Sequence, residues 1–590
     1  MTFPHITMPR MPAAFQAVLL CLLLMAPSAH AGNEKTIALV MKALSNPFFS
    51  RMESGAKAFA RQEGIPLEIF GVDRETDIDH QIDIMENLIS RGYGAIVIAP
   101  ADSRRLVPVC KKAVAGNIRV INVDNPLDAG EMAKSGVSIP FVGPDNFQGA
   151  GQIGNYIHQR LSGKGRAMII EGIRGVQNAE DRKNGLIQAL SKSPGVQIVS
   201  QESANWHMDE AMSLVMKTVR QPDSVDAILC ANDQMALGAL KALDMLDFKK
   251  KIWVTGYDNT EGLRYEMTQG RIHATVEQHP EVMGQTGVML AWNALKGQKI
   301  PDKTITPVDL VTFESMNKKL HLSISSLSNP FFSSLVQGAL SMSKIFGFQT
   351  VVFDAENNDA RQLTDMVGSI RTGLDLLIIN PTHSESIVSG IELANEKHIP
   401  VITVDRKASD ADILCHVESD NVGGGRIAAS AMIRYLKGNG RIIEMEGIPA
   451  ASVSHERGMG FNAMIQRHPD IQIAAREVGN FDREDARQAM QRLLQKSIRF
   501  EAVFAHNDVM ILGVLDALTD AGIDPSTRVL IGFDGIPEVL DQIKQGRLTA
   551  TVGQKPEVMG SLAIQQAARF FRGDDISSSI LVKLELIEKP

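Results

Sequence analysis

A set of planar polar side chains and phenylalanines recurs at intervals through the second half of the chain. It holds three aromatic rings and eight amides, carboxylates or guanidinium groups: Asn329, Phe331, Phe332, Asn380, Asp405, Arg406, Arg457, Phe481, Asn507, Asp534 and Gln554. Planar polar groups of this kind can each engage two neighbouring hydroxyls, which both donate and accept hydrogen bonds. Phenylalanine rings can stack on the apolar C–H faces of a sugar. The set therefore predicts a binding site for a small polyhydroxylated ring.

The composition of this set argues against a metal centre and against an enzyme. It contains no cysteine, and no histidine is placed with a second ligand at metal-binding spacing. Paired carboxylates can cleave glycosidic bonds, but each carboxylate here has an Arg, Asn or Gln partner, which we expect to keep it ionised and unable to act as a general acid. No G-x-S-x-G, Walker A or Rossmann G-x-G-x-x-G motif follows a predicted strand. We expect no catalysis, no metal and no cofactor.

The chain contains two tandem copies of one repeated unit. The segment Ser45–Ser50 recurs as Ser328–Ser333, and a QxPEVMG motif at 278–284 recurs at 554–560. The offset falls from 283 at Asn46 to 276 at Gln278, which predicts a small insertion in the first copy near Met132–Val142. A junction near Glu314–Lys319 gives two domains, 32–316 and 317–590.

The predicted elements place the polar residues at strand ends. Short apolar runs, typical of strands buried on both faces, alternate with helical patterns such as Gln81–Arg91 and Leu106–Ala115. In the first copy these runs are Thr36–Met41, Leu67–Phe70, Ala95–Ala99, Val120–Val123, Ala167–Glu171, Gln197–Ser200, Ala227–Ala231 and Ile252–Gly256. The alternation predicts an α/β fold with parallel sheets, whose ligands lie beyond the carboxyl ends of the strands. About eight strands per copy favour two doubly wound lobes, with a (β/α)₈ barrel as the alternative.

The first 31 residues are typical of an export signal. Arg10 precedes an apolar stretch at Ala13–Ala26, and the segment that follows ends in a small-x-small cleavage pattern at Ala31. The stretch is shorter than the roughly 20 residues of a spanning helix, so we expect a cleaved signal peptide rather than an anchor. Leu20, directly before Cys21, argues against a lipid anchor. The mature chain would not be embedded in a membrane.

Charge and cysteine content exclude other classes. The formal net charge is −8, with no basic run, so we expect no nucleic-acid partner. Cys110, Cys230 and Cys415 are odd in number and contain no C-x-x-C pair, so they predict neither a disulfide framework nor a zinc site.

The order of motifs in the second copy resembles a known family. SNPFF at 328–332, INP at 379–381, VDR at 404–406, HERG at 455–458, FDR at 481–483, HND at 506–508, GFDG at 532–535 and VGQ at 552–554 follow the order found in the type I periplasmic solute-binding proteins of sugar ABC importers. The second copy is especially similar to the ribose-binding members. The resemblance implies tandem periplasmic-binding-protein-like I domains, each with two doubly wound Rossmann-like lobes joined by a three-strand hinge.

The same resemblance implies how the second copy holds its sugar. The first lobe would contribute the residues from Asn329 to Arg406, and the second lobe those from Arg457 to Asp534. Gln554 would stand at a crossover between the lobes. Every one of these positions matches the ribose-binding pattern, so we expect ribose or a close pentose in this copy.

The first copy keeps most of this pattern and departs from it at three positions. It keeps Asn46, Phe48, Phe49, Asp124, Arg182, Asn232, Asp258 and Gln278. Ala99 stands in place of Asn380, Asn125 in place of Arg406, and Trp206 in place of Phe481. The formal charge of the set changes from zero in the second copy to −1 in the first. We expect the first copy to bind a different polyol or sugar, or a sugar with a donor-rich group.

Structural roles are the alternative for several of these residues. Phe48 and Phe49 are candidates for the core, and Asp124 and its counterpart Asp405 for helix caps. Arg182 and Arg457 are candidates for surface ion pairs, and Trp206 for packing between the lobes.

The resemblance also implies partners. In the periplasm, the closed form would deliver its sugar to an ABC permease of the inner membrane. As the alternative, it would dock a chemoreceptor or a histidine kinase ectodomain as a sensor, without transport. DNA-binding repressors share the lobe architecture, but the signal peptide and the absence of an N-terminal helix-turn-helix count against that assignment.

Overall fold

The computed structural model describes residues 36–192, 194–219, 224–247 and 250–589. The predicted signal peptide lies outside these residues. The chain forms two compact units, here called unit 1 and unit 2, which divide between Leu310 and Val311. Among the described residues, no helix is long and apolar enough to cross a membrane.

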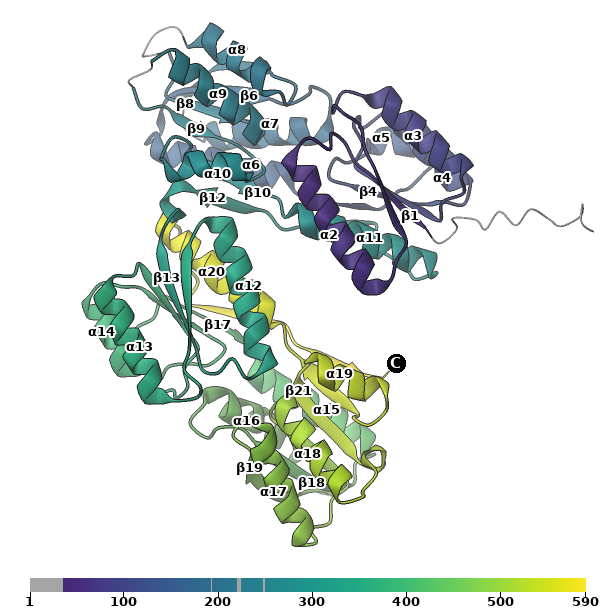
Figure 1. The fold of residues 1–590 in the computed structure, drawn as a ribbon, viewed down its shortest axis with the longest axis vertical. Coiled ribbons are helices and arrows are strands. Elements are labelled where there is room, and N and C mark those ends of the chain that lie inside the picture. The colour runs from purple at the N-terminus through teal and green to yellow at the C-terminus, as the bar shows by residue number, and fades with distance from the viewer. Residues whose placement is uncertain (1–35, 193, 220–223, 248–249, 590) are drawn as a thin grey trace, which may run out of the picture. The chain divides into compact units, whose positions relative to one another are not determined.

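Unit 1 consists of two lobes, each built on a six-stranded sheet (Figure 1). The first lobe has the strand order β11-β5-β4-β3-β1-β2. Its strands are β1 (Ile37–Val40), β2 (Leu67–Phe70), β3 (Ala95–Ile98), β4 (Arg119–Val123), β5 (Phe141–Pro144) and β11 (Lys303–Thr306). Its helices are α2 (Pro47–Glu63), α3 (Ile78–Ser90), α4 (Val107–Ala115), α5 (Ala129–Ser135) and α11 (Pro280–Leu295).

The second lobe of unit 1 has the order β12-β10-β9-β8-β6-β7. Its strands are β6 (Lys164–Glu171), β7 (Gly195–Ser203), β8 (Ala227–Cys230), β9 (Trp253–Thr255), β10 (Ala274–Glu277) and β12 (Asp309–Thr312). Its helices are α6 (Asn146–Arg160), α7 (Gln177–Leu190), α8 (Met208–Thr218), α9 (Asp233–Met245) and α10 (Glu261–Thr268).

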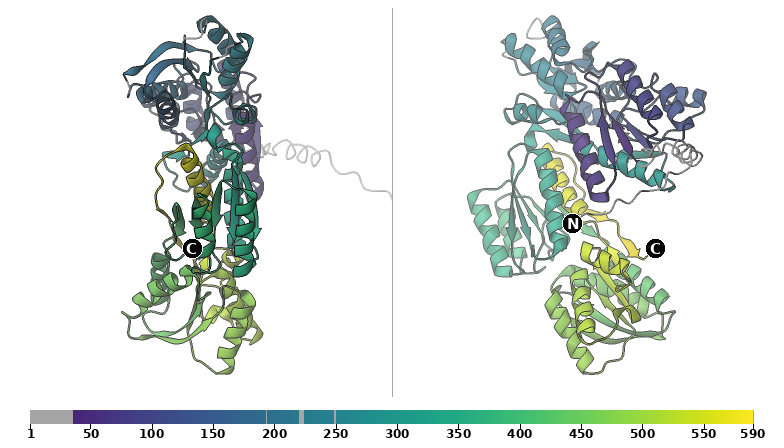
Figure 2. Two further views of the ribbon diagram at one scale, coloured as in Figure 1. Left: turned by 90° about the vertical axis from the view of Figure 1, so that its left-hand side faces the viewer. Right: turned by 45° about the vertical axis from the view of Figure 1, so that its right-hand side comes forward.

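Unit 2 repeats this plan. Its first lobe has the strand order β14-β13-β15-β16-β17-β23. The strands are β13 (Lys319–Ile324), β14 (Gln349–Asp354), β15 (Leu376–Ile379), β16 (Val401–Val404), β17 (Cys415–Ser419) and β23 (Ser579–Val582). The helices are α12 (Pro330–Phe346), α13 (Asp359–Thr372), α14 (Val388–Glu396) and α20 (Pro556–Arg572). In Figure 1, α13 and α14 cover one face of this sheet and α12 and α20 the other, and Figure 2 shows the layers from two further sides.

The second lobe of unit 2 is ordered β19-β18-β20-β21-β22-β24. Its strands are β18 (Gly440–Glu446), β19 (Ile471–Val478), β20 (Ala502–Ala505), β21 (Val529–Asp534), β22 (Ala550–Gly553) and β24 (Glu585–Glu588), and its helices are α15 (Asn421–Tyr435), α16 (Ser452–Ile465), α17 (Arg483–Gln495), α18 (Asp508–Asp520) and α19 (Pro537–Lys544). Single 3₁₀ turns lie at Phe313–Ser315 and Pro525–Thr527.

The chain passes between the lobes of each unit three times. In unit 1 the passages follow β5, β10 and β11, and in unit 2 they follow β17, β22 and β23. The predicted three-strand hinge is therefore confirmed. The open sheets rule out the (β/α)₈ barrel.

The sequence pattern finds eight strands in the first copy, whereas the described residues of unit 1 form twelve. The missed strands are β5, β10, β11 and β12, of four residues each, which stand at or beside the crossovers. Their sequences carry polar residues, a Gly-Pro pair or both, so the apolar runs that mark buried strands are absent. The predicted insertion coincides with α5, because unit 2 has no helix between β16 and β17.

The repeated Ser-Asn-Pro-Phe-Phe segment begins the first helix of each unit. Asn46 caps α2, where its Oδ1 accepts a hydrogen bond from the N–H of Phe48 at 3.1 Å, and Asn329 caps α12 by the same bond to Phe331 at 3.0 Å. A proline occupies the first helical position in both, where its missing N–H costs nothing. The cap fixes the chain so that the phenylalanines turn inward.

Candidate functional site

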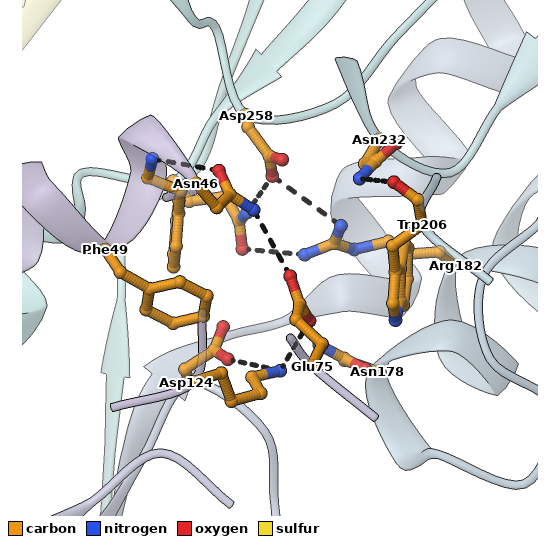
Figure 3. Close-up of a pocket in the computed structure, with 12 residues that line it drawn as sticks. Asn46, Phe49, Glu75, Asp124, Asn178, Arg182, Trp206, Asn232 and Asp258 are labelled. Atoms are coloured by element: carbon orange, nitrogen blue, oxygen red, sulfur yellow. Dashed lines mark hydrogen bonds and ion pairs between the residues drawn. The ribbon is translucent and has the colours of Figure 1, made fainter. Parts of the chain in front are cut away.

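Each unit encloses a small pocket between its two lobes. The pocket of unit 1 is lined by Lys42, Asn46, Phe48, Phe49, Glu75, Asp124, Asn178, Arg182, Trp206, Asn232, Asp258 and Gln278 (Figure 3). The pocket of unit 2 is lined by Asn329, Phe331, Phe332, Asp405, Arg406, Val453, Arg457, Phe481, Asn507, Asp534 and Gln554. The structure thus brings together all the predicted site residues except Asn125 and Asn380.

Several pocket residues hold a left-handed backbone. Asp124 and Asp405 have φ of 64° and 63°, and Asp258 and Asp534 have φ of 116° and 132°. Non-glycine residues rarely adopt these values, and bulky ones do so least. Such strain persists only where surrounding contacts impose it, and it concentrates at functional sites. Here it turns each carboxylate away from its strand and into the pocket.

A buried arginine anchors the second lobe's side of each pocket. Arg182 donates to Asn146 Oδ1 at 2.8 Å, to the carbonyl of Ala231 at 2.8 Å and to Gln278 Oε1 at 3.0 Å. Its Nη1 also lies 3.6 Å from Asp258 Oδ1. Arg182 is 3% exposed, so it is not a surface ion pair.

Arg457 repeats this arrangement in unit 2. It donates to Asn421 Oδ1 at 3.0 Å and to the carbonyl of His506 at 2.6 Å. Its Nη1 lies 3.6 Å from Asp534 Oδ1, and the side-chain amide of Gln554 donates to that same carboxylate at 2.8 Å. The guanidinium is therefore fixed before any ligand binds.

A second buried aspartate, Asp508, which is not among the predicted site residues, holds the loop that follows Asp534. Asp508 accepts hydrogen bonds from the N–H of Gly535 at 2.7 Å, the N–H of Ile536 at 2.9 Å and Thr551 Oγ1 at 2.7 Å. Burial raises the pKa of Asp508 to about 6. The Asn-Asp pair at a strand end, present in both copies, is the sequence signal for this role.

Burial dominates the protonation of the pocket carboxylates. It raises the pKa of Asp534 to about 8, although Arg457 acts in the opposite direction. Burial also raises the pKa of Asp405 and, in unit 1, that of Asp258. The expectation that polar partners keep every carboxylate ionised is therefore wrong, because the loss of hydration outweighs the partners.

Lys42 and Glu75 line the pocket of unit 1 although they are not among the predicted site residues. Lys42 Nζ lies 3.0 Å from Asp124 Oδ2 and 3.5 Å from Glu75 Oε2. The side-chain amide of Asn46 donates to Glu75 Oε1 at 3.2 Å (Figure 3). Burial lowers the pKa of Lys42, but attraction by Asp124 and Glu75 is stronger and raises it overall. Lys42 stands four residues before Asn46, where unit 2 has Ser325 before Asn329.

Asn380 lies behind the pocket of unit 2. It is fully buried, and its side-chain amide donates to Asp405 Oδ2 at 3.2 Å and to the carbonyl of Val404 at 3.1 Å. It therefore orients Asp405. In unit 1, Ala99 has no such amide, and Lys42 takes over the contact with Asp124.

Asn125 does not line the pocket of unit 1, so the structure does not support its prediction as a ligand residue. Its Nδ2 donates to the carbonyl of Pro100 at 3.0 Å, and its Oδ1 faces the second lobe, where it accepts from the N–H of Asn178 at 3.3 Å. Arg406, at the same position of unit 2, instead points into the pocket and lies 5.3 Å from the ring centre of Phe332 and 5.4 Å from that of Phe481. The guanidinium of Arg406 thus lies in the pocket, whereas the shorter amide of Asn125 makes a contact between the two lobes.

Aromatic rings enclose both pockets. The paired phenylalanines meet edge to face at 5.1 Å in each unit, as Phe48–Phe49 and Phe331–Phe332. These rings are also 2–4% exposed, so they belong both to the core and to the pocket wall. Trp206 lies across the pocket, with its ring 5.5 Å from the guanidinium carbon of Arg182.

Several buried polar atoms have no hydrogen-bond partner among the described residues. In unit 2 these include Asp405 Oδ1, Arg406 Nε and Gln554 Oε1, and in unit 1 Asn178 Oδ1. Buried groups are normally paired, so these atoms mark where a polar ligand would complete the network. A ligand with hydroxyl groups supplies both donors and acceptors.

A match to a family of known proteins follows the two-unit division. Residues 37–299 and 320–575 each match the periplasmic binding protein domain. This chain belongs to the periplasmic binding protein family. Periplasmic binding proteins bind their ligands without catalysis, which confirms the expectation that this one is not an enzyme. The resemblance inferred from the motif order is confirmed as well.

Curated relatives of this periplasmic binding protein each correspond to one unit's length. The ribose import binding protein of Bacillus subtilis is 39% identical over 275 residues, which cover 46% of this chain and 88% of that protein. The D-ribose/D-allose-binding protein of Pseudomonas aeruginosa is 38% identical over 295 residues, which cover 49% of this chain and 92% of that protein. A solute-binding protein of Actinobacillus succinogenes, solved with bound D-allose, is 32% identical, covers 47% of this chain and 98% of its own, and gives a TM-score of 0.46.

Proposed function

We propose that this chain is a periplasmic sugar-binding protein with two sites, which delivers its ligands to an ABC permease of the inner membrane. Unit 2 binds ribose or a close pentose, and unit 1 binds a related but different sugar or polyol. The observation that carries the proposal is the pocket of unit 2, which gathers ten of the eleven residues predicted for a sugar. Relatives named for ribose support the same ligand.

Closure of the two lobes is the mechanism of binding. The pocket of unit 2 takes Asp405 and Arg406 from one lobe and Arg457 and Asp534 from the other, so a ligand between them bridges both. It biases the lobes toward the closed form by the free energy of these contacts. Once a bound ligand draws both aspartates into their charged form, they balance the two arginines in formal charge, which suits a neutral ring with many hydroxyls.

Unit 1 differs in ways that argue for another ligand. Its pocket adds Lys42 and Glu75, loses a guanidinium and keeps a formal charge of −1. Trp206 offers a larger stacking surface than Phe481. A neighbouring cleft shares Asn46, Glu75 and Trp206 with the pocket. Its lining holds four carboxylates against the single guanidinium of Arg74, which favours ligands with an excess of hydrogen-bond donors.

Calorimetric titration of ribose into refolded, ligand-free protein (residues 32–590) tests the proposal. We expect one ribose per chain. Asp405→Asn removes one charge while tolerating the left-handed backbone, and it lowers affinity about 10- to 100-fold, the equivalent of a lost charge-assisted hydrogen bond. The matched variant Asp124→Asn in unit 1 leaves ribose binding unchanged. Two ribose molecules per chain, or loss of binding in Asp124→Asn, would overturn the assignment of ligands to units.

A further inference from the structure

Helix α7 of unit 1 begins at the boundary between the two lobes and lacks a cap of its own. Its N-cap residue is Val176, whose side chain cannot accept a hydrogen bond. The first N–H groups of a helix have no partner within it. The N–H of Ala179 bonds to the carbonyl of Val176 at 3.0 Å, which leaves the N–H groups of Gln177 and Asn178 to be satisfied elsewhere.

Side chains of the opposite lobe satisfy both groups. The N–H of Gln177 donates to Ser103 Oγ at 3.2 Å, and the N–H of Asn178 donates to Asn125 Oδ1 at 3.3 Å. Ser103 is 2% exposed and Asn125 is fully buried, so water does not compete for these bonds while the lobes are together. The bond from Asn125 Nδ2 to the carbonyl of Pro100 leaves the carbonyl end of the amide facing the helix.

We propose that Ser103 and Asn125 cap α7 across the lobes, hold unit 1 closed and thereby set its affinity without touching the ligand. Opening the lobes breaks both bonds and returns the two N–H groups to water. Apparent affinity scales with the fraction of molecules in the closed form, so the cap strengthens binding of every ligand by the same factor. The part that concerns affinity rests on the proposed function, whereas the part that concerns closure does not.

Unit 2 joins its lobes differently. Lys407 follows Arg406 and donates its N–H to Ser452 Oγ of the second lobe at 3.0 Å, while its Nζ lies 3.1 Å from Glu456 Oε1. Unit 1 has Pro126 at the position of Lys407, which has no N–H to donate. At this part of the boundary, the second lobe thus supplies the hydrogen-bond donors in unit 1, whereas the first lobe supplies them in unit 2.

Distance measurement between spin labels on the two lobes tests the proposal without knowledge of the ligand. Lys111→Cys on α4 and Met245→Cys on α9 place the labels at exposed sites of opposite lobes. The native cysteines Cys110, Cys230 and Cys415 are buried and would not be labelled in the folded protein. In ligand-free protein of residues 32–590, we expect Ser103→Ala/Asn125→Ala to move the distance distribution toward longer values.

A second variant removes a donor instead of the acceptors. Gln177→Pro deletes the N–H that bonds to Ser103, and proline is favourable at the first position of a helix. Val176 has φ of −85° and ψ of 128°, an extended conformation that a residue before proline adopts readily. We expect this variant also to open the lobes, with less effect than the double variant. Lys407→Gln in unit 2 is the control and should leave the distances in unit 1 unchanged.

Affinity provides the second measurement. For any two sugars that bind unit 1, the double variant should raise both dissociation constants by the same factor, about three- to tenfold, which is about 0.7–1.4 kcal/mol. Unchanged distances in both variants would overturn the proposal, as would a change in the ratio of the two affinities, since that would mean that Asn125 contacts the ligand. If no sugar binds either unit, the proposed function is wrong. The distances between the spin labels would still show whether Ser103 and Asn125 hold unit 1 closed.

Discussion

Lys42 and Asp124 form a buried ion pair of 3.0 Å in the pocket of unit 1, whereas unit 2 has the neutral Ser325 at the position of the lysine. The corresponding aspartate of unit 2, Asp405, is held instead by the amide of Asn380 at 3.2 Å. Two substitutions separate these arrangements: Lys42 stands where unit 2 has Ser325, and Ala99 stands where it has Asn380. The same carboxylate is thus oriented by an ammonium group from one strand or by an amide from its neighbour.

Removal of the ammonium group alone should destabilise unit 1. Lys42→Ala leaves Asp124 and Glu75 buried without their cation, and breaking one partner of a buried pair costs about 3–5 kcal/mol. The double substitution Lys42→Ser/Ala99→Asn supplies the amide of unit 2 and should recover part of the loss. Urea unfolding followed by circular dichroism measures both variants. The control is Lys318→Ala, which breaks a half-exposed pair with Asp375 and should cost less than about 1 kcal/mol. A loss in Lys42→Ala no larger than in this control would contradict the prediction.

Ribose binding by unit 2 should release a proton below about pH 8. Burial raises the pKa of Asp534 to about 8, so this carboxyl group is mostly protonated at neutral pH. Hydroxyl groups that donate to the carboxylate favour its charged form and lower its pKa on binding. Affinity should therefore rise with pH up to about 8 and then level off, by at most tenfold per pH unit. Titrations in buffers of different ionisation enthalpy measure the protons released. Proton uptake on binding, or affinity independent of pH between 6 and 8, would contradict this linkage.

Added salt should lower the ligand affinity of unit 2 more than that of unit 1. The Lys407 side chain is 43% exposed and reaches Glu456 of the second lobe, so dissolved ions screen this contact between the lobes. We expect ribose affinity to fall about two- to fivefold between 0.05 and 0.5 M salt, since exposed pairs contribute about 0.2–1 kcal/mol. Lys407→Gln should bind more weakly at low salt and lose this dependence. An equal dependence in the variant would show that other charges cause it.

The fold and most of the site can be read from the sequence because both depend on local patterns. Buried parallel strands are short apolar runs, and Asp405, Asn507 and Asp534 stand at or just beyond their carboxyl ends in recognisable motifs. Local patterns do not identify Lys42 and Glu75 as pocket residues. Lys42 precedes the repeated motif, and Glu75 lies in a loop after β2 that is longer than its counterpart in unit 2.

The role of Asn125 cannot be read from the sequence for a different reason. Its position at a strand end is that of a ligand residue, but a short amide cannot reach where the longer Arg406 side chain points. Only the approach of α7 from the other lobe gives the amide a partner, and that approach depends on tertiary packing. The substitution of arginine by asparagine therefore signals a changed role without revealing which one.

A glycine beneath the aromatic wall should be essential for ribose binding. A Cβ atom at Gly447, directly after β18, would lie 2.1 Å from Cζ of Phe481, far inside van der Waals contact. Gly447→Ala must therefore displace the Phe481 ring, whose centre lies 5.4 Å from the guanidinium carbon of Arg406, from its place in the pocket wall. We expect ribose affinity to fall at least tenfold, about 1.4 kcal/mol, as measured by calorimetry. Gly368→Ala on α13 is the matched control, because a Cβ there meets no atom within 4 Å, and it should bind ribose as the parent does. Parent-like affinity in Gly447→Ala would mean that the Phe481 ring is not part of the binding wall.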